Sequence, residues 1–218
     1  MGACSMNIDI VVVGAGGFGR ETLDVLDAIE KQSPGSWHVL GVVDDAPSES
    51  ALLLLSRRGI RWLGPLAEWL LTNPSAAYVI AVGSPASRAQ IADQIGSHGL
   101  TAATVIHPRA EIGTLTSVGE GSVICAGTQV STGVEIGPHV HLNPNSTIGH
   151  DARLEACVSV NPGAIISGGV VILDESLVGA GAVILQGLHV GRGATVGAAA
   201  CVTRDVPAFT TVKGVPAR

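Results

Sequence analysis

A six-residue repeat without a single insertion runs through the second half of the chain and limits the folds that it can adopt. From residue 110 the sequence divides into sixteen successive hexads, and the third residue of every hexad, from Ile112 to Val202, is Ile, Leu or Val. The first residue of each hexad is always Ala, Ser, Thr, Val or Leu. A period of six matches neither the 3.6 residues of an α-helical turn nor the alternation of an ordinary strand. It predicts a parallel β-helix in which three hexads close one triangular coil.

This period also predicts which residues meet in space. Sixteen hexads form a little over five coils, stacked about 4.8 Å apart, with residues 18 positions apart lying one above the other. We expect the aliphatic third residue to point into the prism and Gly, which follows it in seven hexads, to serve the corners. Asn143 and Asn161, each followed by Pro, are predicted to form a hydrogen-bonded ladder at one corner.

The residues before the repeat alternate apolar runs with amphipathic stretches, which is typical of βαβ units and a parallel sheet. We predict strands at residues 8–13, 37–45, 76–83 and 102–108, and helices at 20–31, 65–72 and 87–99. The predicted organisation is therefore a flexible tail at 1–6, a Rossmann-like α/β half-domain at 7–105, an all-β parallel β-helix at 106–206 and a C-terminal tail at 207–218.

Composition excludes several classes of function. The net charge of −6 and the pI near 5.6 argue against a nucleic-acid partner, because phosphate binding needs clustered Lys and Arg. The four cysteines have neither the spacing of a zinc site nor that of a disulfide framework, which favours a reducing, cytoplasmic location. The first residues lack the pattern of a signal peptide, and no run of 18 apolar residues indicates a membrane span.

The uninterrupted hexads and the ending "VKGVPAR" resemble the hexapeptide acyltransferases. The stretch "VVVGAGGFGRETLDVL" and the acidic pair at 44 and 45 narrow the resemblance to the NeuD-like and PglD-like sugar acetyltransferases. This group includes sialic acid O-acetyltransferases and bacillosamine or perosamine N-acetyltransferases. The resemblance implies a left-handed β-helix, a homotrimer with active sites between subunits, acetyl-CoA as co-substrate and a nucleotide-linked sugar as acceptor.

His150 is the candidate catalytic base, because it lies near a corner with Asp151 directly beside it. A carboxylate can orient an imidazole and raise its basicity, which suits removal of a proton from an attacking amine or hydroxyl. One coil further on, Gly168 and Gly169 leave room for a thioester, and a main-chain amide there is available to an oxyanion. The alternative is a solvated turn histidine. The resemblance favours catalysis, because the family's base occupies the matching position.

The stretch Gly14 to Gly19 matches GxGxxG between a strand and a helix, where main-chain amides attract phosphate. About 95 residues precede the repeat, which is half of a dinucleotide fold, so a nucleotide-linked sugar is favoured over NAD. Asp44 and Asp45 end the second predicted strand, where a ribose or sugar hydroxyl is expected. The resemblance assigns substrate contacts to a set of matching positions: Gly16, Gly17, Phe18, Asp44, Asp45 and Gly83. Phe18 departs from the family, which often has His at this position.

For acetyl-CoA, the resemblance implies a path along the β-helix between two subunits, with matching positions at Gly168, Ala180 and Ala198. Many relatives carry a second histidine nine residues after the base, where this chain has Ser159, which we assign to cofactor binding through its hydroxyl. No residue cluster calls for a metal. Among the other histidines, His139 and His141 are expected at a subunit contact, His107 at the junction of the two domains, and His38 and His189 at the surface.

These observations predict an acetyl-CoA-dependent N-acetyltransferase acting on the amino group of a nucleotide-linked amino sugar. One alternative is a sugar O-acetyltransferase, which the same base serves. Another is a non-catalytic nucleotide-sugar-binding scaffold, in which replacing His150 changes no measurable function. An NAD-dependent enzyme is the remaining alternative, and cofactor titration tests it.

Overall fold

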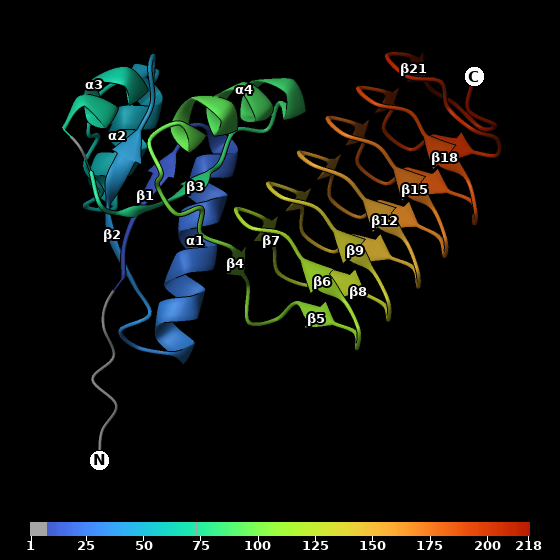
Figure 1. Ribbon diagram of the computed structural model, residues 1–218, viewed down its shortest axis with the longest axis horizontal. Helices are drawn as coiled ribbons and strands as arrows, with labels where there is room; N and C mark the ends of the chain where they lie inside the picture. Colours follow the sequence, from blue (N-terminus) through green and yellow to red (C-terminus); the bar gives the residue numbers. More distant parts are fainter. Residues whose placement is uncertain (1–7, 73) are drawn as a thin grey trace.

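The computed structural model describes residues 8–72 and 74–218, which form an α/β domain followed by a long parallel β-helix (Figure 1). The predicted tail at residues 1–6 lies outside the described residues. The two parts lie side by side, with the α/β domain against the N-terminal coils and the C-terminal coils extending beyond it. None of the described helices is long and apolar enough to cross a membrane.

The α/β domain is built on a three-stranded parallel sheet in the order β2-β1-β3. Its strands are β1 (Ile8–Val13), β2 (Trp37–Val43) and β3 (Ala77–Ile80). Its helices are α1 (Gly17–Gln32), α2 (Glu49–Arg57), α3 (Leu66–Leu71) and α4 (Pro85–Gly96). The last four residues of β1 are buried because helices and the β-helix cover both faces of this central strand.

The structure differs from the sequence prediction at two places in this domain. The fourth strand expected at 102–108 is absent from the sheet, where Ala102 forms only a single bridge to Tyr78. Val105 and Ile106 instead form β4 (Val105–Ile106), which pairs with the β-helix, because the chain turns there into the first coil. The sequence analysis also missed α2, whose leucine run lacks a clear helical period.

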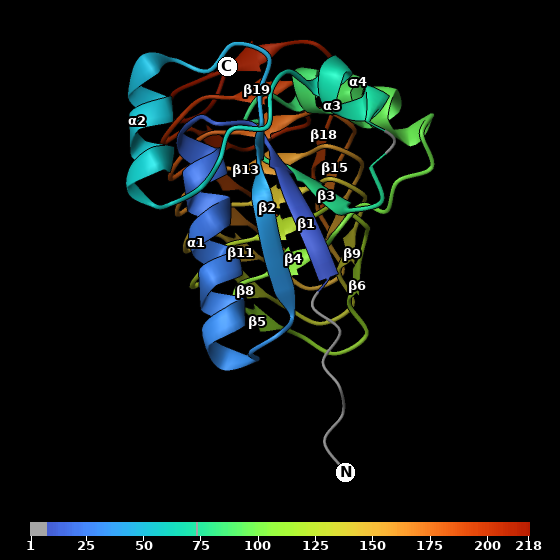
Figure 2. The ribbon, with the colours of Figure 1, turned by 90° about the vertical axis from the view of Figure 1, so that its left-hand side faces the viewer.

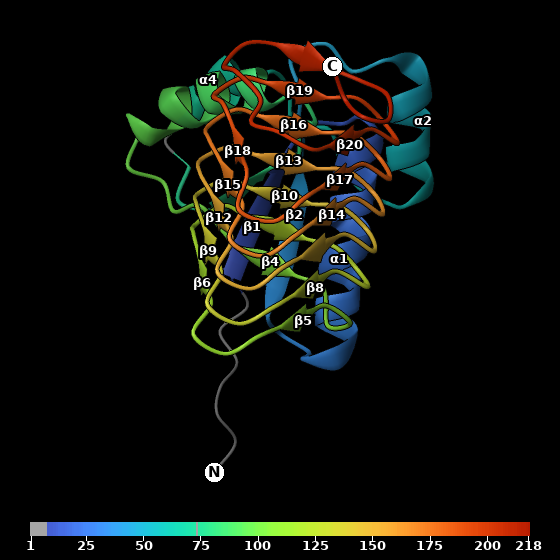
Figure 3. The ribbon, with the colours of Figure 1, turned by 90° about the vertical axis from the view of Figure 1, so that its right-hand side faces the viewer.

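The predicted parallel β-helix is confirmed, and each of the sixteen hexads contributes one short strand, from β5 to β20 (Figure 3). The first stack contains β4, β7 (Val123–Ile124), β10 (His141–Leu142), β13 (Ser159–Val160), β16 (Leu177–Val178), β19 (Thr195–Val196) and β21 (Thr211–Val212). The second stack contains β5 (Glu111–Ile112), β8 (Gln129–Val130), β11 (Thr147–Ile148), β14 (Ile165–Ile166), β17 (Val183–Ile184) and β20 (Cys201–Val202). The third stack contains β6 (Ser117–Val118), β9 (Glu135–Ile136), β12 (Arg153–Leu154), β15 (Val171–Ile172) and β18 (His189–Val190). The segment 207–218, expected as a tail, thus adds β21 to the first stack.

The pairing between coils follows the 18-residue offset that the hexads imply, as in Thr147 opposite Ile165. Aliphatic third residues fill the prism, among them Leu142, Ile148 and Ile166, which are fully buried. The Asn ladder is present, because the side-chain amide of Asn143 donates to Val160 O at 3.0 Å and to Asn161 Oδ1 at 3.4 Å. The stacked backbone therefore fixes which residues are vertical neighbours.

The α/β domain packs on the outward face of the first stack, and we call this contact the interdomain seam (Figure 2). Val105 and Val123 point outward from that stack and join the apolar cluster of β1 and α1. The next outward residues along the stack, His141 and Ser159, are also buried there. The seam therefore lies over the N-terminal coils and leaves Thr211 of β21 exposed.

We predict that Val130→Ala lowers the free energy of unfolding by about 2 kcal/mol, because two buried methyl groups are lost and a cavity remains. Gln129→Ala changes the adjacent, outward-facing residue of the same strand and is expected to stay within about 0.5 kcal/mol of the wild type. Urea unfolding at one fixed protein concentration measures both. Equal losses in the two variants contradict the inward direction assigned to the third hexad position.

Candidate functional site

His150 and Asp151 form a hydrogen-bonded pair at the turn between the second and third stacks, which we call the His150 corner. His150 Nδ1 lies 2.8 Å from Asp151 Oδ2, and both side chains are largely exposed, at 66% and 72%. Because an ionised carboxylate only accepts hydrogen bonds, Nδ1 carries the proton and Nε2 presents its lone pair. No described residue bonds to Nε2. The pair therefore leaves one basic nitrogen facing outward.

The backbone explains how two consecutive side chains meet. Asp151 has a φ of 58°, in the left-handed region, and its amide donates to Thr132 O at 3.1 Å. One coil below, Gly133 leaves the space that the carboxylate occupies, because a Cβ there would lie 2.8 Å from Asp151 Oδ1. The carboxylate thus turns back toward His150.

Gly168 lies directly above the imidazole, as the 18-residue offset predicts. A Cβ at Gly168 would lie 2.5 Å from His150 Nε2, so only glycine leaves room for the ring. The amide of Gly169 donates to His150 O at 2.8 Å, whereas the amide of Gly168 has no partner among the described residues. The space beside Gly168, predicted to admit a thioester, is therefore filled by the imidazole itself, and the corner presents an unbonded ring nitrogen and an unpartnered N–H donor.

A cavity lies at the carboxyl end of the α/β sheet. Its volume is about 150 Å³. Its lining comes from the ends of β1 and β2, the residues after β3, and helices α3 and α4: Val13, Gly14, Val43, Asp44, Asp45, Leu66, Val82 and Ile91. Gly14 has a φ of 118°, which glycine adopts without strain, and Gly16 and Gly17 begin α1 with open space around them. This is where ligands bind in open parallel sheets.

Both predicted aspartates line this cavity and are also held by main-chain amides. Asp44 accepts from Ala15 N at 2.7 Å and from Ala46 N at 2.9 Å, which ties the end of β2 to the glycine loop. Asp45 Oδ1 accepts from Leu66 N at 2.7 Å, at the start of α3. Asp45 Oδ2 has no partner in the described residues and is the freer acceptor.

Phe18 and Gly83 lie where the α/β domain meets the β-helix. The Phe18 ring stacks on the His141 ring with a centroid distance of 4.4 Å. Gly83 is exposed just before α4, and its carbonyl accepts from Ser159 Oγ at 3.3 Å. Phe18 therefore has a packing role at the seam.

The residues predicted to contact the co-substrate do not form one site within the chain. Gly168 lies at the His150 corner, whereas Ala180 and Ala198 are exposed at the turn between the first and second stacks, which we call the alanine corner. Ser159 is 2% exposed and is covered by the chain's own α4 and loop 82–84, because its hydroxyl bonds to Arg88 and Gly83. This placement does not favour the predicted contact between Ser159 and the co-substrate.

His139 and His141 were expected at a subunit contact, but their burial comes from the α/β domain of the same chain. His141 Nε2 donates to Ile80 O at 2.9 Å, and burial holds the pKa of His141 well below its ordinary value of 6.5. Burial also lowers the pKa of His139, whose Nδ1 has no hydrogen-bond partner and whose ring stacks near Tyr78. Both rings are therefore neutral parts of the seam.

The remaining histidines agree with their predicted places. His107 lines a seam cavity of about 190 Å³ together with residues of α1, and burial lowers its pKa. His38 pairs with Asp9 at 2.8 Å at the surface, and His189 lies 3.9 Å from Asp205. Within residues 8–72 and 74–218 no group of His, Cys, Asp and Glu is arranged to hold a metal ion.

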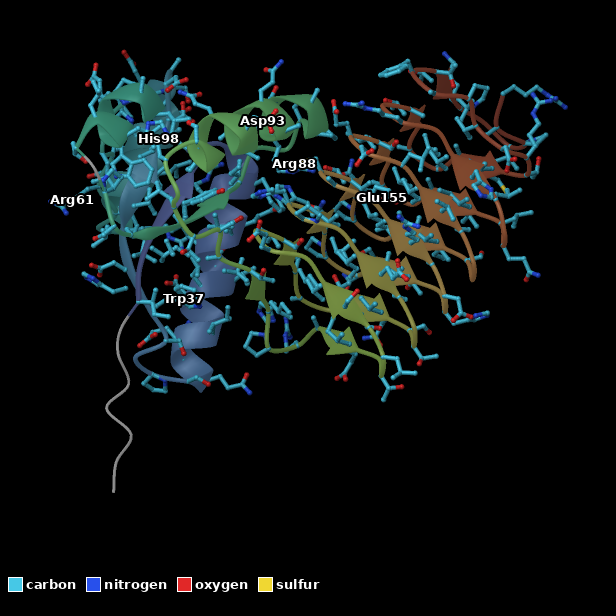
Figure 4. All side chains as sticks on the ribbon, in the orientation of Figure 1. Trp37, Arg61, Arg88, Asp93, His98 and Glu155 are labelled. Atoms are coloured by element: carbon cyan, nitrogen blue, oxygen red, sulfur yellow. The ribbon has the colours of Figure 1, made fainter. Side chains whose placement is uncertain are left out.

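Sequence reasoning missed Arg88, which is fully buried at the seam (Figure 4). A signal was present, because Arg88 precedes Ile91 and Ile95 at helical spacing and so lies on the inward face of α4. A charged residue on an apolar face is the pattern that marks a buried, hydrogen-bonded group.

Comparisons with known proteins agree with this two-part architecture. The family model for the PglD N-terminal domain matches residues 9–95, and the bacterial transferase hexapeptide model (six repeats) matches residues 115–150. The GDP-perosamine N-acetyltransferase of Escherichia coli O157:H7 is 34% identical over 165 residues, which cover 76% of this chain and 72% of that protein. The chain belongs to this family of hexapeptide-repeat sugar N-acetyltransferases.

Two solved structures extend the similarity over nearly the whole chain. A mutant of perosamine N-acetyltransferase from Caulobacter crescentus, in complex with CoA and GDP-perosamine, has a TM-score of 0.85 and 26% identity, covering 96% of this chain and 95% of that one. The acetyltransferase domain of PglB from Neisseria gonorrhoeae, in complex with acetyl coenzyme A, has a TM-score of 0.83 and 31% identity, covering 97% and 98%.

Within one sugar N-acetyltransferase chain, the two candidate regions face opposite sides of the prism. The α/β domain packs on the first stack, whereas His150 lies where the second and third stacks meet. In a triangular prism that corner is opposite the first stack. The chain's own sheet-edge cavity therefore does not face its own His150.

The pKa directions at the seam predict that acid weakens the fold. Unfolding exposes His141, whose ordinary pKa is near 6.5, so below that pH the unfolded state binds a proton that the folded state does not. The free energy of unfolding is therefore unaffected by the protonation of His141 well above pH 6.5 and falls as the pH drops below that value. His141 alone contributes a slope of up to about 1.4 kcal/mol per pH unit.

His141→Gln keeps an N–H donor for Ile80 O and removes the titration, so we expect a smaller loss of melting temperature between pH 7.5 and 5. The matched control is His98→Gln, which changes an exposed side chain just after α4. An unchanged pH dependence in His141→Gln contradicts the assignment.

Proposed function

We propose that the chain transfers an acetyl group from acetyl-CoA to the amino group of a nucleotide-linked amino sugar, with His150 as general base. The observation that carries this proposal is the His150–Asp151 pair, whose Nε2 has no hydrogen-bond partner among the described residues and whose ring fits only because residue 168 is Gly. The relatives bound to CoA and GDP-perosamine support the two substrate classes.

The pair performs the proton transfer in this mechanism. Asp151 accepts from Nδ1–H, which fixes the tautomer and stabilises the imidazolium that forms. Nε2 removes a proton from the amine as its nitrogen attacks. The exposed corner supplies the base, and Asp151 keeps it in one orientation.

The thioester of acetyl-CoA supplies the electrophilic carbonyl carbon. The new N–C bond forms as the C–S bond breaks, and the proton held by His150 is available to the departing thiolate. During attack, negative charge develops on the carbonyl oxygen, and we propose that the Gly168 amide, which has no partner among the described residues, donates to it. No covalent intermediate on the protein is required.

We propose that the working enzyme is a homotrimer, because His150 and the sheet-edge cavity of one chain face opposite sides of the prism. A neighbouring subunit that presents its His150 corner to the seam side of the next chain completes the site. Ile165 of the second stack and Leu185, which directly follows the strand β17 of that stack, are apolar and 44% and 43% exposed. Such a face favours contact with another copy.

We propose that the nucleotide sugar binds the sheet-edge cavity through Gly16, Gly17, Phe18, Asp44, Asp45 and Gly83, and that acetyl-CoA follows Gly168 of one subunit and the alanine corner of another. Cys125, Cys157 and Cys201 are free thiols, which fits a reducing compartment and supports a cytoplasmic location.

The test is an acetyl-transfer assay with GDP-, UDP- and dTDP-linked 4-amino sugars and their hydroxyl counterparts at equal concentrations. We expect one amino sugar nucleotide to be acetylated and to raise the melting temperature. His150→Asn is expected to lower kcat by about 10²- to 10⁴-fold without changing the melting temperature. Preferred transfer to the hydroxyl compound indicates O-acetylation, and full activity in His150→Asn overturns the base assignment.

Gly168→Ala tests the requirement for glycine beside the catalytic ring. The added methyl group would lie 2.5 Å from His150 Nε2, so the ring must move away. We expect kcat/KM for acetyl-CoA to fall by about 100-fold, the scale expected for a 1 Å misplacement, with nucleotide-sugar binding retained. Gly96→Ala, at an open position at the end of α4, is the matched control. Wild-type kinetics in Gly168→Ala contradict the requirement for glycine at this position.

A further inference from the structure

The side chain of Arg88 joins the two domains through several hydrogen bonds. Its guanidinium lies between α4 and the turn between the third and first stacks, which we call the Arg88 corner (Figure 4). Nε donates to His139 O at 2.8 Å, and Nη2 donates to Cys157 O at 2.7 Å and Ser159 Oγ at 2.9 Å. These three acceptors belong to two successive coils.

The other edge of the same guanidinium holds the loop that precedes α4. Nη1 donates to Val82 O at 2.7 Å and, at 3.5 Å, to Gly83 O. Ser159 Oγ in turn donates to Gly83 O at 3.3 Å. One planar group therefore connects loop 82–84 with the β-helix, and only Arg has donors arranged in a rigid fork for this purpose.

Burying a charged guanidinium costs desolvation free energy, so the need for packing alone does not explain an arginine at this position. Burial lowers the pKa of Arg88 to about 10, so the side chain remains charged at neutral pH. None of the ion pairs among the described residues involves Arg88, and the oxygen atoms that accept its hydrogen bonds are carbonyl and hydroxyl oxygens. Replacing buried charged groups with apolar residues of similar volume often leaves the free energy of unfolding unchanged or raises it.

The loop held by Arg88 belongs to the proposed substrate region. Val82 lines the sheet-edge cavity, and Gly83 is a candidate substrate contact. Two further residues of this sheet edge are held by His141. The carbonyl of Ile80 accepts a hydrogen bond from His141 Nε2, and the Phe18 ring stacks on the His141 ring. The rim of the cavity is thus fastened directly to the first stack.

We propose that Arg88 is a positioning residue, and that Ser159 serves it: together they fix loop 82–84 on the β-helix so that a bound nucleotide sugar presents its amine at a constant place relative to the neighbouring subunit's catalytic corner. This inference rests on the proposed function. It replaces the co-substrate contact predicted for Ser159 with a role in the seam.

The experiment compares Arg88→Lys and Ser159→Ala with Arg58→Lys. Lys keeps the charge but cannot span both domains, and Ser159→Ala removes one acceptor with little loss of volume. The control Arg58 lies within the α/β domain, bonded to Arg20 O and paired with Asp24 and Asp27. Each variant is measured for kcat and KM, for binding of whichever of GDP, UDP and dTDP the wild type binds, for melting temperature, and for hydrogen exchange.

We expect Arg88→Lys to lower kcat by about 10- to 100-fold while nucleoside diphosphate binding stays within about twofold, because the cavity remains but its position shifts. Ser159→Ala is expected to show a smaller loss of the same kind. Amides of α4 and of residues 139–159 should exchange faster, and those of β1 should not. Arg58→Lys should show neither effect.

A lower melting temperature with unchanged kcat and unchanged exchange at the seam overturns the proposal and leaves Arg88 a purely stabilising residue. A change in KM for acetyl-CoA alone in Ser159→Ala also overturns it, because that result assigns Ser159 to the co-substrate. If the wild type transfers no acetyl group, the proposed function fails, while the exchange measurements still decide whether Arg88 fastens the loop.

Discussion

The vertical pairing of the coils is the constraint on which the rest of this structure depends. Each strand is only two residues long, so a single strand has little stability, and the hydrogen bonds between coils hold them at an offset of 18 residues. The aliphatic residues inside the prism prevent slippage, because a shift by one residue would turn them outward. This register places Gly168 over His150 and Gly133 under Asp151.

The interdomain seam is held by apolar packing and by side-chain hydrogen bonds, whereas the interior of the prism is packed with aliphatic side chains. Apolar packing dominates where Val105 and Val123 meet the α/β domain, whereas Arg88, His141 and Ser159 make directed hydrogen bonds further along the same stack. Apolar contact tolerates small rotations, but the hydrogen bonds of a rigid guanidinium do not. The polar part of the seam is therefore suited to setting the orientation of the α/β domain, and with it the position of the sheet-edge cavity.

Much of the candidate site could be predicted because its geometry is local or follows the repeat. His150 and Asp151 are neighbours in sequence, and Gly168 follows from counting 18 positions. Ser159 was assigned to co-substrate binding because it takes the place of a second histidine in the family that the chain resembles, whereas the structure buries it beneath α4. A repeat indicates which residues of a coil point outward, but it contains no information about what covers them.

The sequence by itself determined the β-helix, its register and the pairing of an imidazole with a carboxylate at a corner, because a period without insertions leaves one way to stack the coils. Only the tertiary structure decided that Val105 and Ile106 leave the α/β sheet, that His139 and His141 are buried within their own chain, and that Arg88 joins the domains. The last two outcomes depend on contacts between residues about 50 to 70 positions apart with no shared period, and such contacts are set by the packing of two complete surfaces.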